Sequence, residues 1–219
     1  QENFDFVNAY LGRVSPIVRN HGGLIVKYMG DGMMAVFPQR AEDALVAALE
    51  KLRQVELYNQ VRSERGYTLI QVGIGIHTGK MMLGTVGEPE RMQSDLLSDA
   101  VNLTTRLEGL SKEYGASIII SHEYLQRLPD PAAYKLRFLG KSQVKGRQGL
   151  VSIYEVFDAD PAAQIERKLE TRADFEAALR LYYDNHLTEA SRLFQNVLQH
   201  NPQDKAAALY LDRSTRNLM

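Results

Sequence analysis

Near the start of the chain, the pattern of apolar and polar positions is first that of a helix and then that of β-strands. Apolar residues recur at helical spacing over residues 4–18 and predict an amphipathic helix, which Pro16 is expected to kink or end. Two apolar runs, at 24–28 and 33–37, then flank the sequence Gly30-Asp31-Gly32. Because Asp-Gly favours the tight turns that join antiparallel strands, this pattern predicts a β-hairpin.

The middle of the chain contains a long helical pattern and further extended runs. A buried stripe predicts a helix over about 41–65, formed by Ala44, Leu45, Ala48, Leu52, Val55 and Val61. Residues 70–77 predict a buried strand with 80–86 as its partner, and segment 87–94 is polar and turn-rich. Ser98 has the side chain of an N-cap and predicts a helix that begins at the next residue.

Shorter elements complete this part of the chain. The patterns predict a strand over 116–121, a short helix over 122–128, and closing strands over 134–138 and 151–157. The alternation of helices with hairpins and strands predicts an α/β (α+β) domain with a mixed sheet rather than an all-parallel one. After residues 158–161 the pattern becomes purely helical, so we place the end of this domain, residues 1–158, there.

A helical tail over 171–219 is predicted to follow a linker over 159–170. Its small, apolar and terminating positions match one 34-residue tetratricopeptide repeat at Ala178, Leu181, Ala190, Phe194, Val197 and Pro202. Residues 205–218 would form a capping helix. One repeat does not usually bury its own face, so the tail is expected to pack on the preceding domain or on a dimer mate, with peptide binding as the alternative.

Composition narrows the classes of function. Hydrophobic residues make up 44% of the 219 residues and charged residues 24%, which is typical of a globular protein. The net charge of −1 excludes a general attraction to nucleic acid or anionic membrane. The absence of cysteine excludes disulfides and thiolate metal sites, and a cytoplasmic location fits. We find no membrane-spanning run or signal peptide, and the first residue, Gln1, suggests a fragment of a longer polypeptide.

Four stretches carry the candidate chemistry. They are GLIVKYMGDG at 23–32, GIGIHTG at 73–79, SDAVNLTTRLE at 98–108 and VKG at 144–146. Each resembles a signature of the class III nucleotide cyclases, in the order and spacing of that family, and the resemblance covers residues 1 to about 157. It implies a ferredoxin-like cyclase domain with a small all-helical C-terminal extension. It also implies an adenylate cyclase (a lyase of signal transduction) that converts ATP to 3′,5′-cyclic AMP and pyrophosphate.

The resemblance makes Asp31 one of two carboxylates that bind a pair of Mg²⁺ or Mn²⁺ ions. Attack of the ribose 3′-hydroxyl on the α-phosphate needs one ion to lower the pKa of the hydroxyl and another to hold the triphosphate. Carboxylate oxygens suit such hard ions. The second aspartate of the family lies on a strand before the first helix, and the chain begins after that point, so we expect that strand in the longer protein. Alone, Asp31 could be only a turn residue.

Lys27 and Asp95 match the purine-reading pair of the family. Adenine presents an acceptor at N1 and a donor at its 6-amino group, which an ammonium and a carboxylate complement. Guanine reverses this pattern, and guanylate cyclases usually carry a glutamate in place of the lysine. The pair therefore favours ATP over GTP. The structural alternative is a surface lysine and a loop aspartate.

Asn102 and Arg106 are spaced i, i+4 and should share one helix face. The resemblance implies that Asn102 orients the ribose and that Arg106 neutralises charge developing on the α-phosphate. It implies that Lys145 contacts the terminal phosphates. Arg91 could also approach the phosphates, whereas we expect a structural role for His77. The alternative for the Asn102 and Arg106 pair is a solvated polar stripe.

In the family, the metal carboxylates come from one subunit and the other site residues from its partner. The chain carries members of both sets, which implies a homodimer with two shared sites and an upstream regulatory domain. Two other readings stay open: a guanylate cyclase, and an inactive cyclase-like module for dimerisation or nucleotide sensing. A diguanylate cyclase is not supported, because the chain has no Gly-Gly-Asp/Glu-Glu-Phe stretch.

Overall fold

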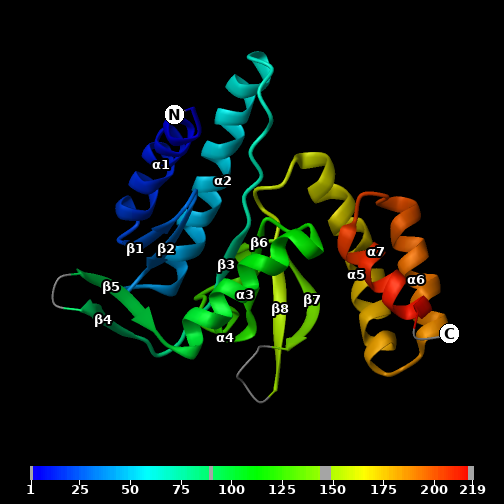
Figure 1. Ribbon diagram of the computed structural model, residues 1–219. Helices are drawn as coiled ribbons and strands as arrows, with labels where there is room; N and C mark the ends of the chain where they lie inside the picture. The colour runs from blue at the N-terminus through cyan, green and yellow to red at the C-terminus, as the bar shows by residue number, and fades with distance from the viewer. Residues whose placement is uncertain (1, 89–90, 144–148, 217–219) are drawn as a thin grey trace. The chain divides into compact units, whose positions relative to one another are not determined.

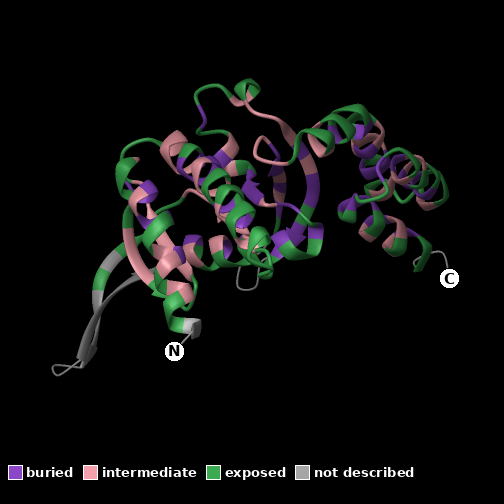
Figure 2. Cartoon of the chain, turned by 90° about the horizontal axis from the view of Figure 1, so that it is seen from above, coloured by how far each residue is buried: buried purple, intermediate pink, exposed green. Residues whose placement is uncertain are grey.

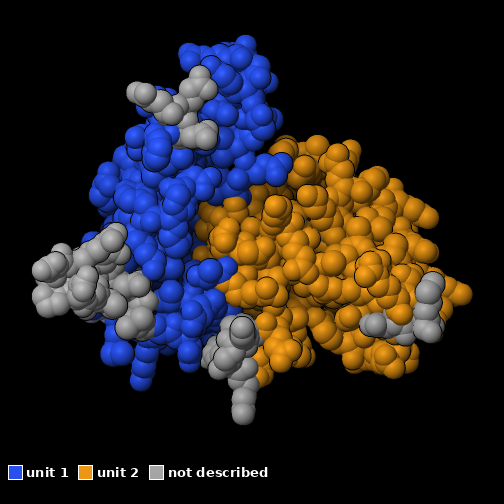
Figure 3. Space-filling view, viewed as in Figure 1, with its two compact units in different colours: residues 1–72, 76–105, 123–129 blue, residues 73–75, 106–122, 130–219 orange. Residues whose placement is uncertain are grey.

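The computed structural model describes residues 2–88, 91–143 and 149–216 and has the mixed α/β fold that the sequence predicts (Figure 1). The chain divides into two compact units (Figure 3). The first comprises residues 1–72, 76–105 and 123–129, and the second comprises residues 73–75, 106–122 and 130–219. Within the described ranges, no helix is both long enough and apolar enough to cross a membrane.

Helices α1 (Glu2–Asn20) and α2 (Ala41–Glu64) pack against each other in the first unit. Helix α1 continues past Pro16, so the expectation that this proline could end the helix is wrong. The burial of neighbouring Ile17 and Val18 outweighs the backbone hydrogen bond that proline cannot donate. The core here contains Tyr10, Val14 and Val55, with Leu11, Met33, Ile70 and Val72 packed against it.

The predicted hairpin is confirmed by strands β1 (Leu24–Met29) and β2 (Gly32–Val36), which pair antiparallel. Met29 pairs with Gly32, which leaves a two-residue loop of Gly30 and Asp31. Gly30 has φ 65° and Asp31 does not have a positive φ, which is the pattern of a II′ turn. Glycine is needed at the first loop position because a side chain there would be strained.

The strand predicted over 70–77 is shorter in the structure, where β3 contains only Ile74–Ile76. The side chain of Asn59 on α2 accounts for the first residue of the difference, Ile70. Its Oδ1 accepts a hydrogen bond from the Ile70 N–H at 2.8 Å, and its Nδ2 donates to the Ile70 carbonyl at 2.9 Å. These bonds occupy both backbone groups that a strand ladder would use at this residue.

The pairing predicted between 70–77 and 80–86 is also wrong. Strand β4 (Met82–Glu88) pairs antiparallel with β5 (Arg91–Leu97), so much of the segment 87–94 that was predicted as turns lies in strands. The two strands are adjacent in sequence, and a local hairpin closes a shorter loop than the predicted pairing.

Helix α3 (Asp99–Tyr114) begins where the sequence predicts. The Ser98 hydroxyl accepts a hydrogen bond from the Val101 N–H at 3.3 Å and so caps the first turn. Leu103, Leu107 and Leu110 are buried on one face of the helix. The chain leaves it through Gly115, whose φ of 67° is typical of a helix C-terminus.

The second unit is organised around a four-stranded sheet in the order β3-β6-β8-β7. Strand β6 (Ile118–Ser121) pairs antiparallel with β8 (Leu150–Val156), which pairs antiparallel with β7 (Leu136–Gln143). Buried residues concentrate in these strands (Figure 2). The short helices α4 (His122–Leu125) and η1 (Pro131–Ala133) follow β6 along the chain.

Three helices form the tail: α5 (Ala162–Tyr183), α6 (Leu187–His200) and α7 (Lys205–Arg216). Helix α5 begins at Ala162 and so includes most of the residues expected to form a linker. The aromatic side chains of Phe175, Phe194 and Tyr210 pack together inside the tail, with ring centroids 5.6–6.4 Å apart. Its assignment as a tetratricopeptide repeat remains a prediction.

A buried ionic cluster joins this tail to the sheet. Arg137 on β7 donates to Glu155 on β8, with Nη2 2.8 Å from Oε2, and to Asp204 just before α7. Lys168 on α5 donates to Glu155 and, at 2.6 Å, to Asp160. Burial lowers the pKa of Lys168, but the charges of Glu155 and Asp160 outweigh it, so the pKa is raised. The tail therefore packs on the preceding domain, as predicted.

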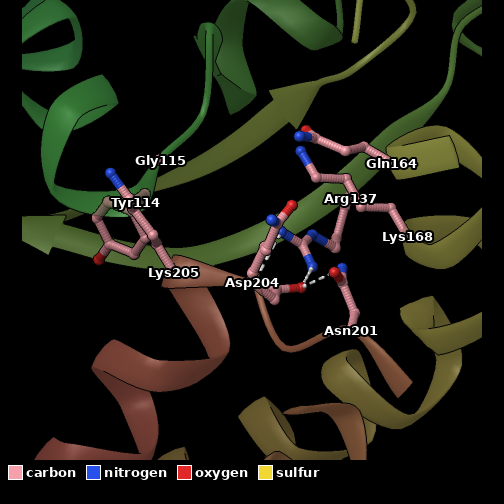
Figure 4. A pocket seen from close by; sticks show the side chains of 9 residues that line it. Tyr114, Gly115, Arg137, Gln164, Lys168, Asn201, Asp204 and Lys205 are labelled. Atoms are coloured by element: carbon pink, nitrogen blue, oxygen red, sulfur yellow. Dashed lines mark hydrogen bonds and ion pairs between the residues drawn. The ribbon is translucent and has the colours of Figure 1, made fainter. Parts of the chain in front are cut away.

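The cluster borders a small cavity of about 30 Å³, which is large enough for one water molecule (Figure 4). The close-up shows Arg137 directed toward Asp204, with Asn201 on the other side of that carboxylate. Arg137, Glu155 and Asp204 each have a side-chain exposure of 1%. Removing one member therefore leaves a buried charge without its partner.

We expect Arg137→Leu to lower the free energy of unfolding by about 3–5 kcal/mol, because buried Asp204 would lose its pair with Arg137 and Glu155 would keep only Lys168 of its two cationic partners. Urea denaturation measures the change. Arg137→Lys should fall between this variant and the wild type, because it keeps the charge and loses the forked hydrogen bonds. Arg216→Leu is the control, because its pair with Asp212 is exposed. Equal effects of Arg137→Leu and Arg216→Leu would contradict a structural role for the cluster.

Candidate active site

Asp31 lies at the exposed tip of the β1–β2 hairpin. Burial, and secondarily the charge of Asp31, raise the pKa of Tyr10 to about 12, so the phenol stays neutral. Asp31 has the oxygen donors that Mg²⁺ and Mn²⁺ prefer. In the part of the chain that the structure describes, no group of three or more His, Asp or Glu side chains could hold a metal ion. Asp31 fits as a single ligand of such an ion.

Lys27 is on β1, four residues before Asp31, and is partly buried. The register of the hairpin shifts between Ile25 and Lys27, which is a bulge directly before the lysine. Bulges change the direction in which the following side chains point. The apolar pattern of residues 24–28 does not predict this bulge.

Asp95 lies on β5, opposite Gly84 of β4. Strand β5 lies beside β1 in the first unit, so the structure brings the strands of Lys27 and Asp95 together. The purine-reading role of this pair remains a prediction. The neighbouring positions of β1 and β5 agree with it.

Asn102 and Arg106 are one turn apart on α3, and both side chains are exposed. The buried leucines at 103 and 107 directly follow them in sequence, so the packing of α3 fixes the direction of the polar pair. This arrangement fits two groups that meet a ligand from outside. It agrees equally with the solvated polar stripe that the sequence left open.

Lys145 lies outside the described residues. Arg91 begins β5, and the structure describes its backbone only.

Two glycines of the second signature allow close packing. A Cβ on Gly73 would lie 1.9 Å from the Ser111 Oγ, and one on Gly79 would lie 2.8 Å from the Ala100 Cβ. Both contacts are to residues of α3. His77 is partly buried and lies near Gly79, which fits a structural role.

The model of the adenylate and guanylate cyclase catalytic domain matches residues 1–156. The chain belongs to this family. An adenylate cyclase of Anabaena cylindrica is 41% identical over an alignment of 161 positions, which covers 71% of this chain and 32% of that protein. A terminal-differentiation specific adenylate cyclase of Dictyostelium discoideum is 32% identical over an alignment of 220 positions, which covers 98% of this chain and 10% of that protein.

The guanylyl cyclase Cya2 is similar in structure, with a TM-score of 0.61 and 30% identity over 71% of this chain and 80% of that one. The cyclase family thus explains the arrangement of the first 156 residues. The Dictyostelium match also extends over the helical tail. This chain spans a third or less of the length of those two adenylate cyclases.

Proposed function

We propose that the chain is the catalytic domain of an adenylate cyclase that converts ATP to 3′,5′-cyclic AMP and pyrophosphate. The observation that carries the proposal is the match to the cyclase family over residues 1–156. The proposed site residues all lie within this range: Lys27, Asp31, Asp95, Asn102, Arg106 and Lys145. The exposed Asn102 and Arg106 on a well-packed helix add support.

Lys27 and Asp95 select the base in this proposal. The Lys27 ammonium donates to N1 of adenine, and the Asp95 carboxylate accepts from the 6-amino group. Their strands, β1 and β5, lie beside each other, which suits two groups that read one edge of a purine. GTP remains the second candidate substrate, because the chain is also similar to a guanylyl cyclase.

In the reaction, the 3′-oxygen of the ribose attacks the α-phosphorus and a new O–P bond forms. The bond to the bridging oxygen of pyrophosphate breaks, and the hydroxyl proton passes to solvent. Asn102 orients the ribose for this attack, and Arg106 neutralises negative charge on the α-phosphate in the transition state. Lys145 holds the terminal phosphates.

Divalent ions, when bound, lower the pKa of the attacking hydroxyl and offset the charge of the triphosphate. Asp31 would hold them together with a second carboxylate, which we expect on a strand that precedes α1 in the longer protein. The site forms across a homodimer, with Asp31 from one subunit and Lys27, Asp95, Asn102, Arg106 and Lys145 from its partner. An inactive, nucleotide-sensing module is the alternative.

Arg106→Ala should reduce kcat for cyclic AMP formation by roughly 100- to 1,000-fold, the range for loss of one transition-state donor. The rate is measured on the full-length protein with Mn²⁺ and saturating ATP. Arg192→Ala, at an exposed arginine of α6, is the control and should leave the rate unchanged. A variant that binds ATP weakly but keeps its kcat would show that the role given to Arg106 is wrong.

Lys27→Glu combined with Asp95→Cys should lower kcat/KM for ATP by at least about tenfold, because two base contacts are lost. The same variant should raise the ratio of cyclic GMP to cyclic AMP in a competition between ATP and GTP. Unchanged use of ATP would contradict the assignment of these two residues.

A further inference from the structure

The hydroxyl of Tyr210 on α7 contacts three other elements of the second unit: β7, α3 and α5. It donates a hydrogen bond to the Leu139 carbonyl on β7 at 2.8 Å. It also lies 3.4 Å from the Tyr114 hydroxyl at the end of α3 and 3.3 Å from the Tyr183 hydroxyl at the end of α5. The Tyr210 side chain is 1% exposed, so no solvent replaces these partners.

On the sheet side, this hydroxyl is fitted to an irregularity in β7. The register with β8 shifts between Phe138 and Gly140, so Leu139 is the extra residue of a β-bulge. Gly140 has φ 119°, and a Cβ there would lie 2.0 Å from the Tyr210 hydroxyl oxygen. The bulge thus leaves the Leu139 carbonyl available to accept the hydrogen bond from Tyr210. The missing side chain of Gly140 leaves room for the end of the tyrosine ring.

On the other side, α7 holds the last turn of α3. The Arg213 Nη2 donates to Glu113 at 2.7 Å, and its Nη1 lies 3.4 Å from the Tyr114 hydroxyl. The side chain of Lys205 covers Gly115, where a Cβ would meet the lysine Cδ at 2.7 Å. The tail therefore contacts three consecutive residues at the end of α3.

Arg106 lies on the same helix, eight residues before Tyr114, or about 12 Å along its axis. A helix transmits a shift or rotation of one end to the other, and misplacement of a catalytic group by about 1 Å can cost 100-fold in rate. We propose that Tyr210 is a positioning residue of the cyclase reaction, whose hydroxyl fixes α3 against β7 and so directs Arg106. This inference rests on the proposed function.

Burial, and then the neighbouring Tyr114 and Tyr183 hydroxyls, raise the pKa of Tyr210 well above its ordinary value. Tyr210 stays a neutral donor across the physiological pH range. The hydrogen bonds of the Tyr210 hydroxyl to its partners therefore do not change with pH in this range.

The test is Tyr210→Phe in the full-length protein, which removes the hydroxyl and keeps the ring. We expect kcat for cyclic AMP formation to fall about tenfold, with KM for ATP changed by less than about twofold. Tyr182→Phe is the matched control, because its ring lies 5.2 Å from that of Tyr210 but its hydroxyl has no hydrogen bond within the described residues. This control should keep the wild-type rate, and an equal loss in both variants would overturn the proposal.

A double-mutant cycle separates positioning from a general loss of folded enzyme. If Tyr210 acts through Arg106, Tyr210→Phe should change kcat by less than about twofold in an Arg106→Ala background. A further tenfold loss there would overturn the proposal.

Hydrogen exchange provides a readout without activity. The amides in the last turn of α3 should exchange about tenfold faster in Tyr210→Phe and at the wild-type rate in Tyr182→Phe. Unchanged exchange in Tyr210→Phe would overturn the positioning role. Absence of cyclic nucleotide from the unsubstituted protein would instead overturn the proposed function, and with it the role of Tyr210 in that reaction.

Discussion

The packing of the second unit depends on the ion pairs of one buried side chain, the guanidinium of Arg137. Its partners, Glu155 and Asp204, belong to the sheet and to the tail respectively. A buried charge is tolerated only when it is paired and hydrogen-bonded. Glu155 pairs with Arg137 within the sheet, and Asp204 of the tail accepts from the remaining Nη1. For the same reason, Glu155 needs Lys168 of α5 as well as Arg137. The tail thus completes the domain that the cyclase family covers, and residues after 156 are part of its packing.

The candidate catalytic groups, in contrast to Arg137, are exposed to solvent. Asp31, Asn102 and Arg106 are exposed, but each belongs to an element that is fixed from its buried side. The hairpin tip of Asp31 is set by a two-residue turn, and α3 is held by its buried leucines and, at its far end, by α7. Rigid elements that present polar groups outward suit a site completed by a second subunit. In our proposal, a single chain accordingly shows half of each site.

Local signals in the sequence predicted the elements that carry the candidate site. The Gly-Asp-Gly turn and the serine cap are each specified by a few neighbouring residues, so β1, β2 and α3 lie where they were expected. Long-range contacts explain the failures. Asn59 takes the backbone groups of Ile70, and the partners Arg137 and Asp204 are 67 positions apart. The periodicity of a single sequence contains neither contact, and the same is true of the three partners of Tyr210.

The most direct test of a shared cyclase site is complementation between two inactive variants. Asp31→Asn and Arg106→Ala of the full-length protein are each assayed for cyclic AMP with Mn²⁺, alone and after mixing under conditions that exchange subunits. Each variant alone should be inactive, whereas a one-to-one mixture should recover about a quarter of the wild-type rate, because half of the dimers contain one intact site of two. No recovery from mixed dimers that native mass spectrometry shows to form would contradict a site built from Asp31 of one subunit and Arg106 of the other.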